Sequence, residues 1–211
     1  MKTTVLSLLL ITFYLTGQSQ NITTASFKLS GNATEIISAQ LLMDNIFFDI
    51  DAKGNLVNYT CILGGKISHY NTFDGKNVEG KIKSIGNTII TYYDHFDGDE
   101  KNGKIKSIGG IAIGYYDRFD ENAGKIKSIE QNAITYYDRF ANNEERGKIK
   151  FIGGVTITYY DNFIEKEKFG KIKAIGNITV DYYNNFDTYE TPGSIKSITG
   201  NSLSIYATGE R

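Results

Sequence analysis

Short stretches in which apolar and polar residues alternate cover most of the chain, and the same stretch returns at a regular interval. Residues 103–109 read GKIKSIG, and residues 113–119, which follow closely, read IGYYDRF. Alternation with a period of two, in segments rich in β-branched and aromatic residues, predicts half-buried β-strands. The glycine pair between the two segments predicts a tight turn. The pattern therefore predicts a β-hairpin.

This hairpin unit recurs from about residue 58 to the C-terminus. GKIK motifs, with one GSIK variant at the end, begin at Gly80, Gly103, Gly124, Gly147, Gly170 and Gly193. Pairs of tyrosines begin at Tyr92, Tyr115, Tyr136, Tyr159 and Tyr182. Successive lysine motifs lie 23, 21, 23, 23 and 23 residues apart. A fixed period of this length indicates a repeat architecture.

The repeats favour an antiparallel β-meander over a parallel β-solenoid. In a solenoid with one coil per repeat, equivalent lysines such as Lys81 and Lys104 stack about 4.8 Å apart. Two ammonium groups at that distance repel by about 0.9 kcal/mol even in water. In a meander a tyrosine-bearing strand separates them, and at about 10 Å salt screens most of the repulsion. We therefore predict an all-β fold, an antiparallel β-meander of two-strand repeats that forms a curled sheet or half-barrel, with a β-solenoid as the alternative.

The side-chain faces of the sheet can be predicted from one turn. A three-residue turn over residues 86–88 pairs Ile82 with Tyr92, and directly opposed residues share a face. One predicted face carries Ile82, Ser84, Ile90, Tyr92, Asp94 and Phe96. The other carries Lys81, Lys83, Ile85, Ile89, Thr91, Tyr93 and His95, with a cation–π contact between Lys81 and Tyr93. The first face is mostly apolar, so we expect the N-terminal segment, curling of the sheet or a second copy of the chain to bury it.

Residues 1–19 have the pattern of a secretory signal peptide. Lys2 supplies a positive charge, residues 5–15 form an apolar run, and Gly17 and Ser19 are small residues before a predicted cleavage at Gln20. The apolar run falls short of the roughly 20 residues that a membrane-spanning helix needs. No cysteine follows it directly, so no lipid anchor is expected. We expect a secreted, periplasmic or cell-surface protein.

Residues 20–57 differ from the repeats and are predicted to cap the repeat array of residues 58–211, because an open sheet needs its end covered. Residues 22–29 and 46–50 have strand composition, whereas residues 34–43 fit a short helix or a strand. A hairpin turn is predicted over residues 52–55.

Composition argues against several functional classes. The formal net charge is −1, so the chain as a whole has no electrostatic attraction for nucleic acid. Its two histidines, His69 and His95, occupy variable positions of the repeat, and no zinc spacing is present. Cys61 is the only cysteine, and we expect a buried small residue rather than a reactive thiol. We predict no cofactor, no metal site and no enzymatic activity.

One acidic or amide residue per repeat follows the tyrosine pair. The set comprises Asp94, Asp117, Asp138, Asp161 and Asn184. A row of equivalent carboxylates suits a structural network in which each Asp accepts hydrogen bonds from turn amides or hydroxyls. A catalytic carboxylate pair, and with it a hydrolase, is the remote alternative.

The second tyrosine of each pair forms a regular aromatic row with lysines beside it. The candidate binding residues are Tyr93, Tyr116, Tyr137, Tyr160, Tyr183, Lys104 and Lys125. Aromatic rows can stack sugars or peptides. Cross-strand packing within the sheet is the alternative interpretation of the same row.

The GKIKSIG and YYDRF units resemble those of uncharacterised secreted repeat proteins of Bacteroidota-type bacteria, which implies a location and not an activity. Residues 58–206 are also loosely similar to the YD (Rhs-type) repeat, in which Tyr-x-Tyr-Asp is followed by Gly-Arg-Leu and a glycine turn. That second resemblance implies a curved antiparallel β-sheet shell on a secreted or surface protein.

Together these observations predict an exported, non-catalytic β-repeat protein that acts as a structural or binding module. The alternative is a carbohydrate- or cell-surface-binding protein that uses the tyrosine and lysine face. Expected partners are a polysaccharide, another surface protein or a second copy of the chain, and not nucleic acid.

Overall fold

The computed structural model describes residues 24–29, 36–43, 46–51, 56–61 and 65–200, with the exception of residues 154, 164 and 188. The predicted signal peptide and the last residues of the predicted array lie outside these ranges. The described part is all-β apart from one 3₁₀ turn, η1 (Thr72–Asp74). None of its helices is long and apolar enough to span a membrane.

The N-terminal part forms a small antiparallel sheet of four strands in the order β1-β2-β3-β4. Its strands are β1 (Thr24–Leu29), β2 (Ile36–Met43), β3 (Ile46–Asp51) and β4 (Leu56–Cys61). The segment that fitted a helix or a strand is therefore a strand, β2. The predicted antiparallel pairing of β3 with β4 is confirmed, and the predicted turn of residues 52–55 lies outside the described residues.

The repeats form a second antiparallel sheet of twelve strands in which each strand lies beside its neighbours in sequence. Its strands are β5 (Ile67–His69), β6 (Ile82–Ile85), β7 (Thr88–Tyr92), β8 (Ile105–Ile108), β9 (Ile111–Tyr115), β10 (Ile126–Ile129), β11 (Asn132–Tyr136), β12 (Ile149–Ile152), β13 (Val155–Tyr159), β14 (Ile172–Ile175), β15 (Ile178–Tyr182) and β16 (Ile195–Thr199). The predicted meander is confirmed, and the β-solenoid alternative is wrong.

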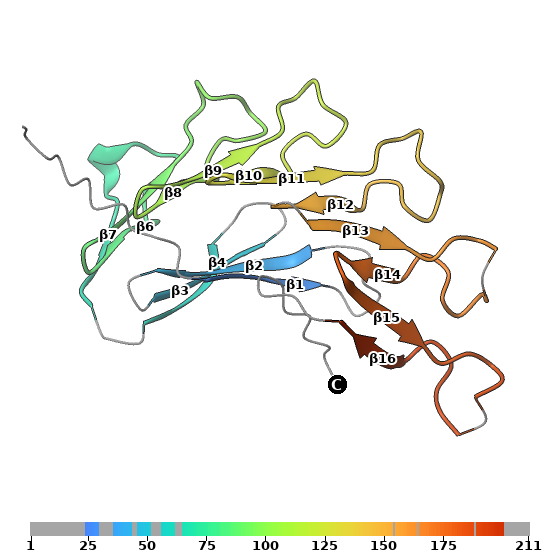
Figure 1. Cartoon of the computed structure of the whole chain (residues 1–211). Coiled ribbons are helices and arrows are strands. Elements are labelled where there is room, and N and C mark those ends of the chain that lie inside the picture. Colours follow the sequence, from blue (N-terminus) through green and yellow to red (C-terminus); the bar gives the residue numbers. More distant parts are fainter. Residues whose placement is uncertain are drawn as a thin grey trace, which may run out of the picture.

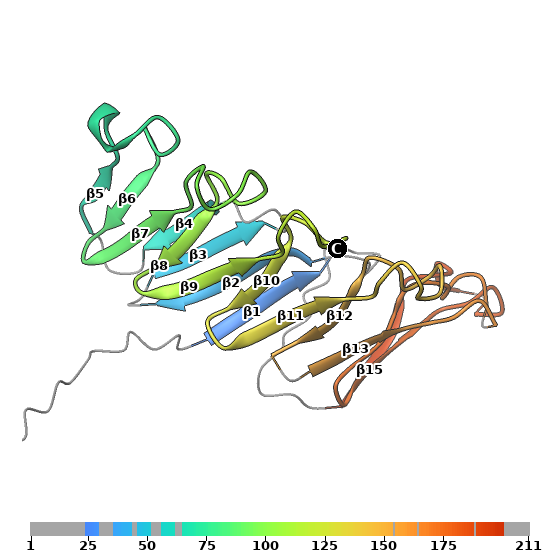
Figure 2. The same cartoon turned by 90° about the horizontal axis from the view of Figure 1, so that it is seen from above.

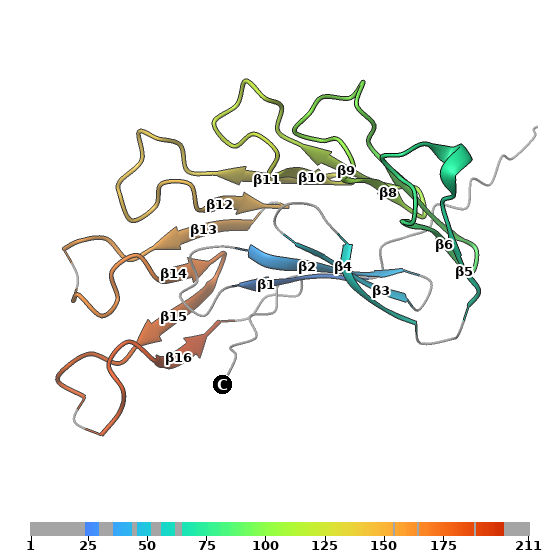
Figure 3. The same cartoon turned by 180° about the vertical axis from the view of Figure 1, so that it is seen from behind.

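The large sheet is curved and open, and the small sheet lies within its concavity (Figures 1 and 3). Isoleucines of the large sheet form one buried cluster with Ala39 of β2 and Phe48 of β3. The N-terminal strands therefore cover the concave face of the array rather than its end. β4 belongs wholly to the small sheet, so the change from one sheet to the other falls between β4 and β5, after the predicted boundary at residue 58.

The short turns of the hairpins contain two residues, not the three that the sequence predicted. Ile85 pairs with Thr88, and Ser84 pairs with Ile89. A one-residue change of register moves side chains to the other face. Ile85 therefore faces the core together with Ile90, and Ser84 and Ile89 lie on the convex face. The predicted division of these residues between the two faces is wrong at these positions.

A β-bulge lies at every junction between repeats, and in β8, β10, β12 and β14 it explains why both isoleucines of the four-residue strand are buried. In regular alternation Ile105 and Ile108, three residues apart, would face opposite sides. The register shifts at this point, because Thr91 pairs with Ser107 but Tyr92 pairs with Ile105. The extra residue returns Ile105 to the concave face, where it is 1% exposed and Ile108 is 0% exposed. The same shift occurs at the five other junctions.

Candidate functional site

All the long connections between repeats project from one edge of the large sheet, opposite the two-residue turns (Figure 2). They span residues 71–80, 94–103, 117–124, 138–147, 161–170 and 184–193. We call this set the loop edge. It carries features that repeat once per hairpin, and these features make it the candidate functional site.

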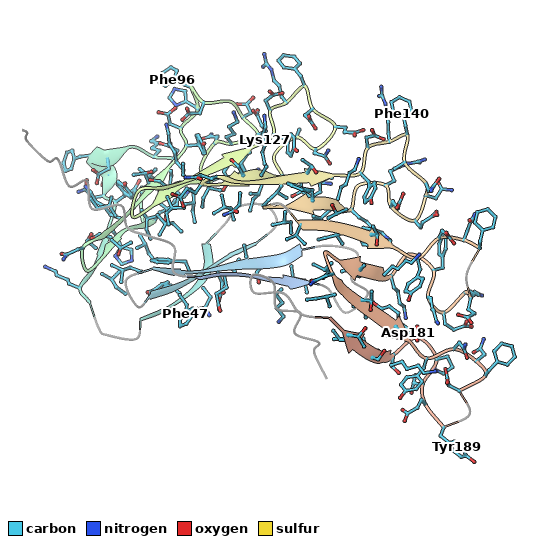
Figure 4. All side chains as sticks on the ribbon, in the orientation of Figure 1. Phe47, Phe96, Lys127, Phe140, Asp181 and Tyr189 are labelled. Atoms are coloured by element: carbon cyan, nitrogen blue, oxygen red, sulfur yellow. The ribbon has the colours of Figure 1, made fainter. Side chains whose placement is uncertain are left out.

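Each loop holds one phenylalanine almost completely in solvent. The six are Phe73 (100% exposed), Phe96 (85%), Phe119 (85%), Phe140 (82%), Phe163 (91%) and Phe186 (84%). Phe96 and Phe140 lie at the outer tips of their loops (Figure 4). The sequence placed Phe96 on the buried face of the sheet, and that prediction is wrong. The strand ends at Tyr92, before the phenylalanine, because the chain turns at Asp94.

The residue two positions before each phenylalanine fixes the turn. Asp94 Oδ1 accepts a hydrogen bond of 2.8 Å from the backbone N–H of Phe96, and Asp138 Oδ1 accepts the equivalent bond from Phe140. The other four loops repeat this bond with Asn71, Asp117, Asp161 and Asn184 as the acceptors. Such side-chain-to-backbone bonds are characteristic of Asx turns. They agree with the structural interpretation of the Asp row, whose carboxylates bind turn amides.

A clamp at the base of each loop joins it to the neighbouring repeat. The N–H of Gly103 donates to the carbonyl of Tyr93 at 2.9 Å, and the φ of Gly103 is 76°, a value that glycine adopts without steric cost. The ammonium of Lys81 donates to the carbonyl of Gly103 and lies 4.8 Å from the centroid of the Tyr92 ring. The ring contact of Lys81 is thus with Tyr92 and not with Tyr93 as predicted. Each loop therefore starts and ends at fixed points.

The tyrosines of the predicted binding row make contacts that join neighbouring repeats. The Tyr93 hydroxyl donates to the carbonyl of Ile113 at 2.9 Å, and Lys106 Nζ lies 5.1 Å from the Tyr93 ring centroid. Tyr116, Tyr137 and Tyr160 make the same hydroxyl bond, and a lysine covers each of these rings and that of Tyr183. Burial raises the pKa values of Tyr93, Tyr116, Tyr137 and Tyr160. Ligand binding by this row stays a prediction.

Lys104 and Lys125, the two lysines predicted to bind a ligand, also lie in clamps. Their ammonium groups donate to the carbonyls of Gly124 and Gly147 in the following repeats. They lie 5.0 and 4.5 Å from the ring centroids of Tyr115 and Tyr136. The structure therefore places the predicted residues together, along the bases of the loops, but engages them in contacts within the array.

The loop edge is strongly acidic although the chain as a whole is nearly neutral. The six loops contain 17 acidic and 7 basic residues, a net charge of −10 out of the total of −1. The rest of the chain therefore carries +9. The overall net charge conceals this separation of charge between the loops and the rest of the chain. An acidic edge disfavours anionic partners such as nucleic acid and acidic lipid.

Two loops place a cation of their own on the exposed ring. The Arg118 guanidinium lies 4.8 Å from the Phe119 ring centroid, and that of Arg139 lies 5.0 Å from the Phe140 centroid. His95 lies 3.8 Å from Phe96, centroid to centroid. In the last two loops this position is an asparagine, Asn162 or Asn185. Their phenylalanine rings have no cation from the preceding residue.

A pocket of about 450 Å³ opens between the loops of residues 138–147 and 161–170. Its lining includes Asn142, Asn143, Glu144, Arg146, Asp161 and Phe163. Within the described residues, no group of three or more histidine, cysteine or acidic side chains is arranged to hold a metal ion.

No protein-family model matches the chain, and no curated protein and no solved structure is significantly similar to it. The site is therefore interpreted from its own geometry.

Proposed function

We propose that this protein is an exported, non-catalytic binding module that holds its partner along the loop edge, with one phenylalanine contact per repeat. The observation that carries the proposal is the set of six phenylalanines, each at least 82% exposed and each in the same Asx turn. Large exposed apolar groups in a regular arrangement are typical of interaction surfaces.

The Asx turns favour binding because they hold the backbone of each phenylalanine before the partner arrives. An aromatic side chain has few rotatable bonds, so immobilising it costs little entropy. Aromatic residues are also enriched among the residues that dominate binding energy. Six weak contacts on one rigid sheet act together, since after the first contact the others form at high effective concentration.

A binding role rather than catalysis is supported by how the loop-edge acids are used. Asp94, Asp138 and their equivalents accept backbone hydrogen bonds that shape the loops. A set of six near-equivalent positions also suits a partner with several contact points better than a single reaction centre. Export is supported by the signal-peptide pattern of residues 1–19.

A second candidate is an anionic polysaccharide bound to the convex face. Lys127, Lys150 and Lys173 lie over tyrosine rings at 5.6, 5.5 and 5.9 Å from the centroids. In the part of the chain that the structure describes, no carboxylate lies within ion-pair distance of these three lysines. Lys127 lies on the outer surface of the sheet (Figure 4).

Two matched variants separate these candidates. The loop variant changes Phe96, Phe119, Phe140 and Phe163 to serine, and the face variant changes Lys106, Lys127, Lys150 and Lys173 to serine. Both are compared with the wild type for binding to an arginine-rich peptide, to neutral polysaccharides (cellulose, chitin and starch) and to anionic ones (heparin and polygalacturonate), with circular dichroism as the fold control.

Binding of any probe that the loop variant loses and the face variant keeps is the expected result. Binding that only the face variant loses would overturn the proposal in favour of the convex face. Wild-type protein that binds none of the probes, or a loop variant that binds as the wild type does, would also count against it.

A further inference from the structure

The pocket between the loops of residues 138–147 and 161–170 is lined by an acidic residue, Glu144, that has little exposed surface. Glu144 is 5% exposed. No residue that the structure describes donates a hydrogen bond to its carboxylate, although it attracts the ammonium of Lys148. That ammonium is directed to the carbonyl of Gly170 and the ring of Tyr159. Among the described residues the only fully buried side-chain oxygen without a partner is Glu100 Oε2, so the carboxylate of Glu144 is open to the pocket and can receive a donor from outside the chain.

The junctions on either side of this pocket show what Glu144 lacks. Before it, Glu121 accepts a hydrogen bond of 3.1 Å from the backbone N–H of Arg139 in the next loop. After it, Glu167 accepts one from the side-chain amide of Asn185 in the next loop. In both places the following loop supplies the donor. Between the loops of residues 138–147 and 161–170, the space that such a donor would occupy is the pocket.

The other wall of the pocket presents an acceptor and an open aromatic face. Asp161 Oδ1 accepts a hydrogen bond of 3.0 Å from the backbone N–H of Phe163, and both residues line the pocket. Phe163 is 91% exposed, and its neighbour Asn162 supplies no cation for the ring. The pocket thus combines two carboxylates with one uncovered ring.

The same protein already places a guanidinium on the equivalent phenylalanine ring of two earlier loops. Arg118 and Arg139 stack on Phe119 and Phe140 at 4.8 and 5.0 Å. A guanidinium is planar, stacks on aromatic rings and donates to carboxylates with matching geometry. Phe163, Glu144 and Asp161 together offer the ring and the carboxylates that a guanidinium binds, and the preceding residue Asn162 supplies no guanidinium.

Electrostatics favours a cation in spite of one positive residue in the lining. Arg146 also lines the pocket, but its side chain is exposed, where solvent screens its repulsion. Glu144 is less exposed than Arg146, so its attraction is screened less. The whole loop edge carries a net charge of −10, which draws basic molecules toward it.

We propose that this pocket is a socket for an arginine side chain of a basic partner polypeptide. The guanidinium would stack on Phe163 and donate hydrogen bonds to Glu144 and Asp161. The inference rests on the proposed function, because it names the class of partner that the loop edge would hold. The remaining phenylalanines would contact apolar or cationic groups along the same polypeptide.

The test is a titration of the ¹⁵N-labelled full chain, followed by NMR. The probes are N-acetyl-arginine amide, the uncharged citrulline analogue, a hexa-arginine peptide and the neutral sugar cellotriose. We expect both arginine probes to shift resonances of Asn143, Glu144 and Phe163, and the citrulline and sugar probes to shift none of them. The shifts should weaken as salt is raised, because part of the attraction is ionic.

Two glutamate variants with the same loss of charge test the position of the site. Glu144→Gln should weaken hexa-arginine binding by about tenfold, since bonds to charged groups exceed neutral ones in strength. Glu79→Gln removes a charge from the first loop, far from the pocket, and should weaken binding less than about threefold. Phe163→Ser, at an exposed position that folding does not need, provides a second pocket variant that should also weaken binding.

The outcomes separate this inference from the proposed function. Equal binding of arginine and citrulline, or equal losses in the Glu144 and Glu79 variants, would overturn the socket. Shifts at the same residues with cellotriose but not with arginine would overturn it too, while the loop edge would stand as a binding surface for sugars. The proposed function itself fails only if the loop variant binds every probe as the wild type does, or if the wild type binds none.

Discussion

The ammonium of Lys125 lies 4.5 Å from the centroid of the Tyr136 ring. From that place it donates hydrogen bonds of 3.0 Å to the carbonyl of Gly147 and to the side chain of Asn122. Lys125 thus connects its own loop, strand β11 and the loop that follows β11. The equivalent lysine makes the same glycine contact in four other repeats.

Removal of this clamp should destabilise the array. We expect Lys125→Met, which keeps the apolar stem, to lower the free energy of unfolding by about 2 kcal/mol, since it loses a charge-assisted hydrogen bond and a cation–π contact. Urea denaturation followed by circular dichroism measures the change. The control is Lys127→Met, at an exposed lysine two residues later in β10, which should change stability by less than about 0.5 kcal/mol. Equal effects of the two substitutions would contradict the clamp.

Glu130 occupies a backbone conformation that glycine takes in the other short turns. Its φ is 53°, and among the described residues it is the only non-glycine with a positive value. Gly86, Gly109, Gly153 and Gly176 hold the same position with φ between 52° and 58°. The left-handed conformation costs an L-residue about 1 kcal/mol, so Glu130→Gly should raise stability by roughly 0.5–1 kcal/mol.

The reciprocal change controls for the loss of the glutamate side chain itself. Gly109→Ala should lower the urea midpoint, while Glu130→Gly raises it. A drop in both variants would mean that the side chain of Glu130, and not its backbone, determines the outcome at that turn.

The exposed phenylalanines should contribute almost nothing to folding. Phe140→Ser should change the free energy of unfolding by less than about 0.5 kcal/mol, as is usual for exposed positions. Ile134→Ala, in the core of the preceding strand β11, should cost about 2–5 kcal/mol. Thermal unfolding of the two variants measures the contrast. A large loss of stability in Phe140→Ser would mean that the ring packs against the array.

The buried tyrosines should make the fold sensitive to alkali. Burial raises the pKa of Tyr92 to about 12 and also raises those of Tyr136, Tyr159 and Tyr182. A phenol with a raised pKa holds its proton more tightly in the folded state. Its stabilisation is therefore complete below pH 10, near the pKa of about 10 of an unfolded tyrosine, and is lost as the pH rises through 12.

The lowered pKa values of Lys81, Lys148 and Lys171, caused by burial, act in the opposite direction, because the unfolded chain then binds more protons. Tyr92→Phe isolates one tyrosine. The variant should be less stable than the wild type at pH 8, where it lacks the hydrogen bond to the Ile82 carbonyl. Between pH 10 and 12 it should lose less stability than the wild type. Parallel stability curves for the two proteins across that range would contradict the assignment.

The period of the sequence was sufficient to predict the hairpins and their antiparallel order. Eleven of the twelve strands fall where the GKIK and Tyr-Tyr segments predict them, and only β5 lies outside these motifs. The equivalent lysines of successive repeats correctly favoured the meander over the solenoid, because the repulsion between two ammonium groups about 4.8 Å apart can be calculated from the sequence spacing alone.

The side-chain faces of the sheet could not be predicted in the same way. One residue more or less in a turn, or one extra residue in a bulge, moves the side chains that follow to the other face. A Gly-Asn-Thr segment suits turns of two or three residues, and the composition of Gly86–Thr88 does not distinguish them. The β-bulge can be recognised in the sequence from the spacing of two isoleucines. Ile105 and Ile108 are three positions apart and both apolar, which a regular strand with one buried face does not explain.

The candidate site was missed for a related reason. The composition of the segment places Phe96 in a strand, whereas Asp94, two residues earlier, is a turn signal that favours an exposed loop. The small sheet shows a further limit. Its hairpin pairing is local and was predicted, but the contact of Phe48 with the concave isoleucines joins segments far apart in sequence.

The small sheet within the concavity also sets a natural limit on the number of repeats. In β14 the core isoleucines Ile172 and Ile175 are 2% and 1% exposed, but in β16 Ile195 and Ile198 are 43% and 49% exposed. An internal duplication would lengthen the arc without lengthening its cover, so the new isoleucines would meet water. The four N-terminal strands therefore limit how many repeats can bury their isoleucines, and the array and its cover can change in length during evolution only together.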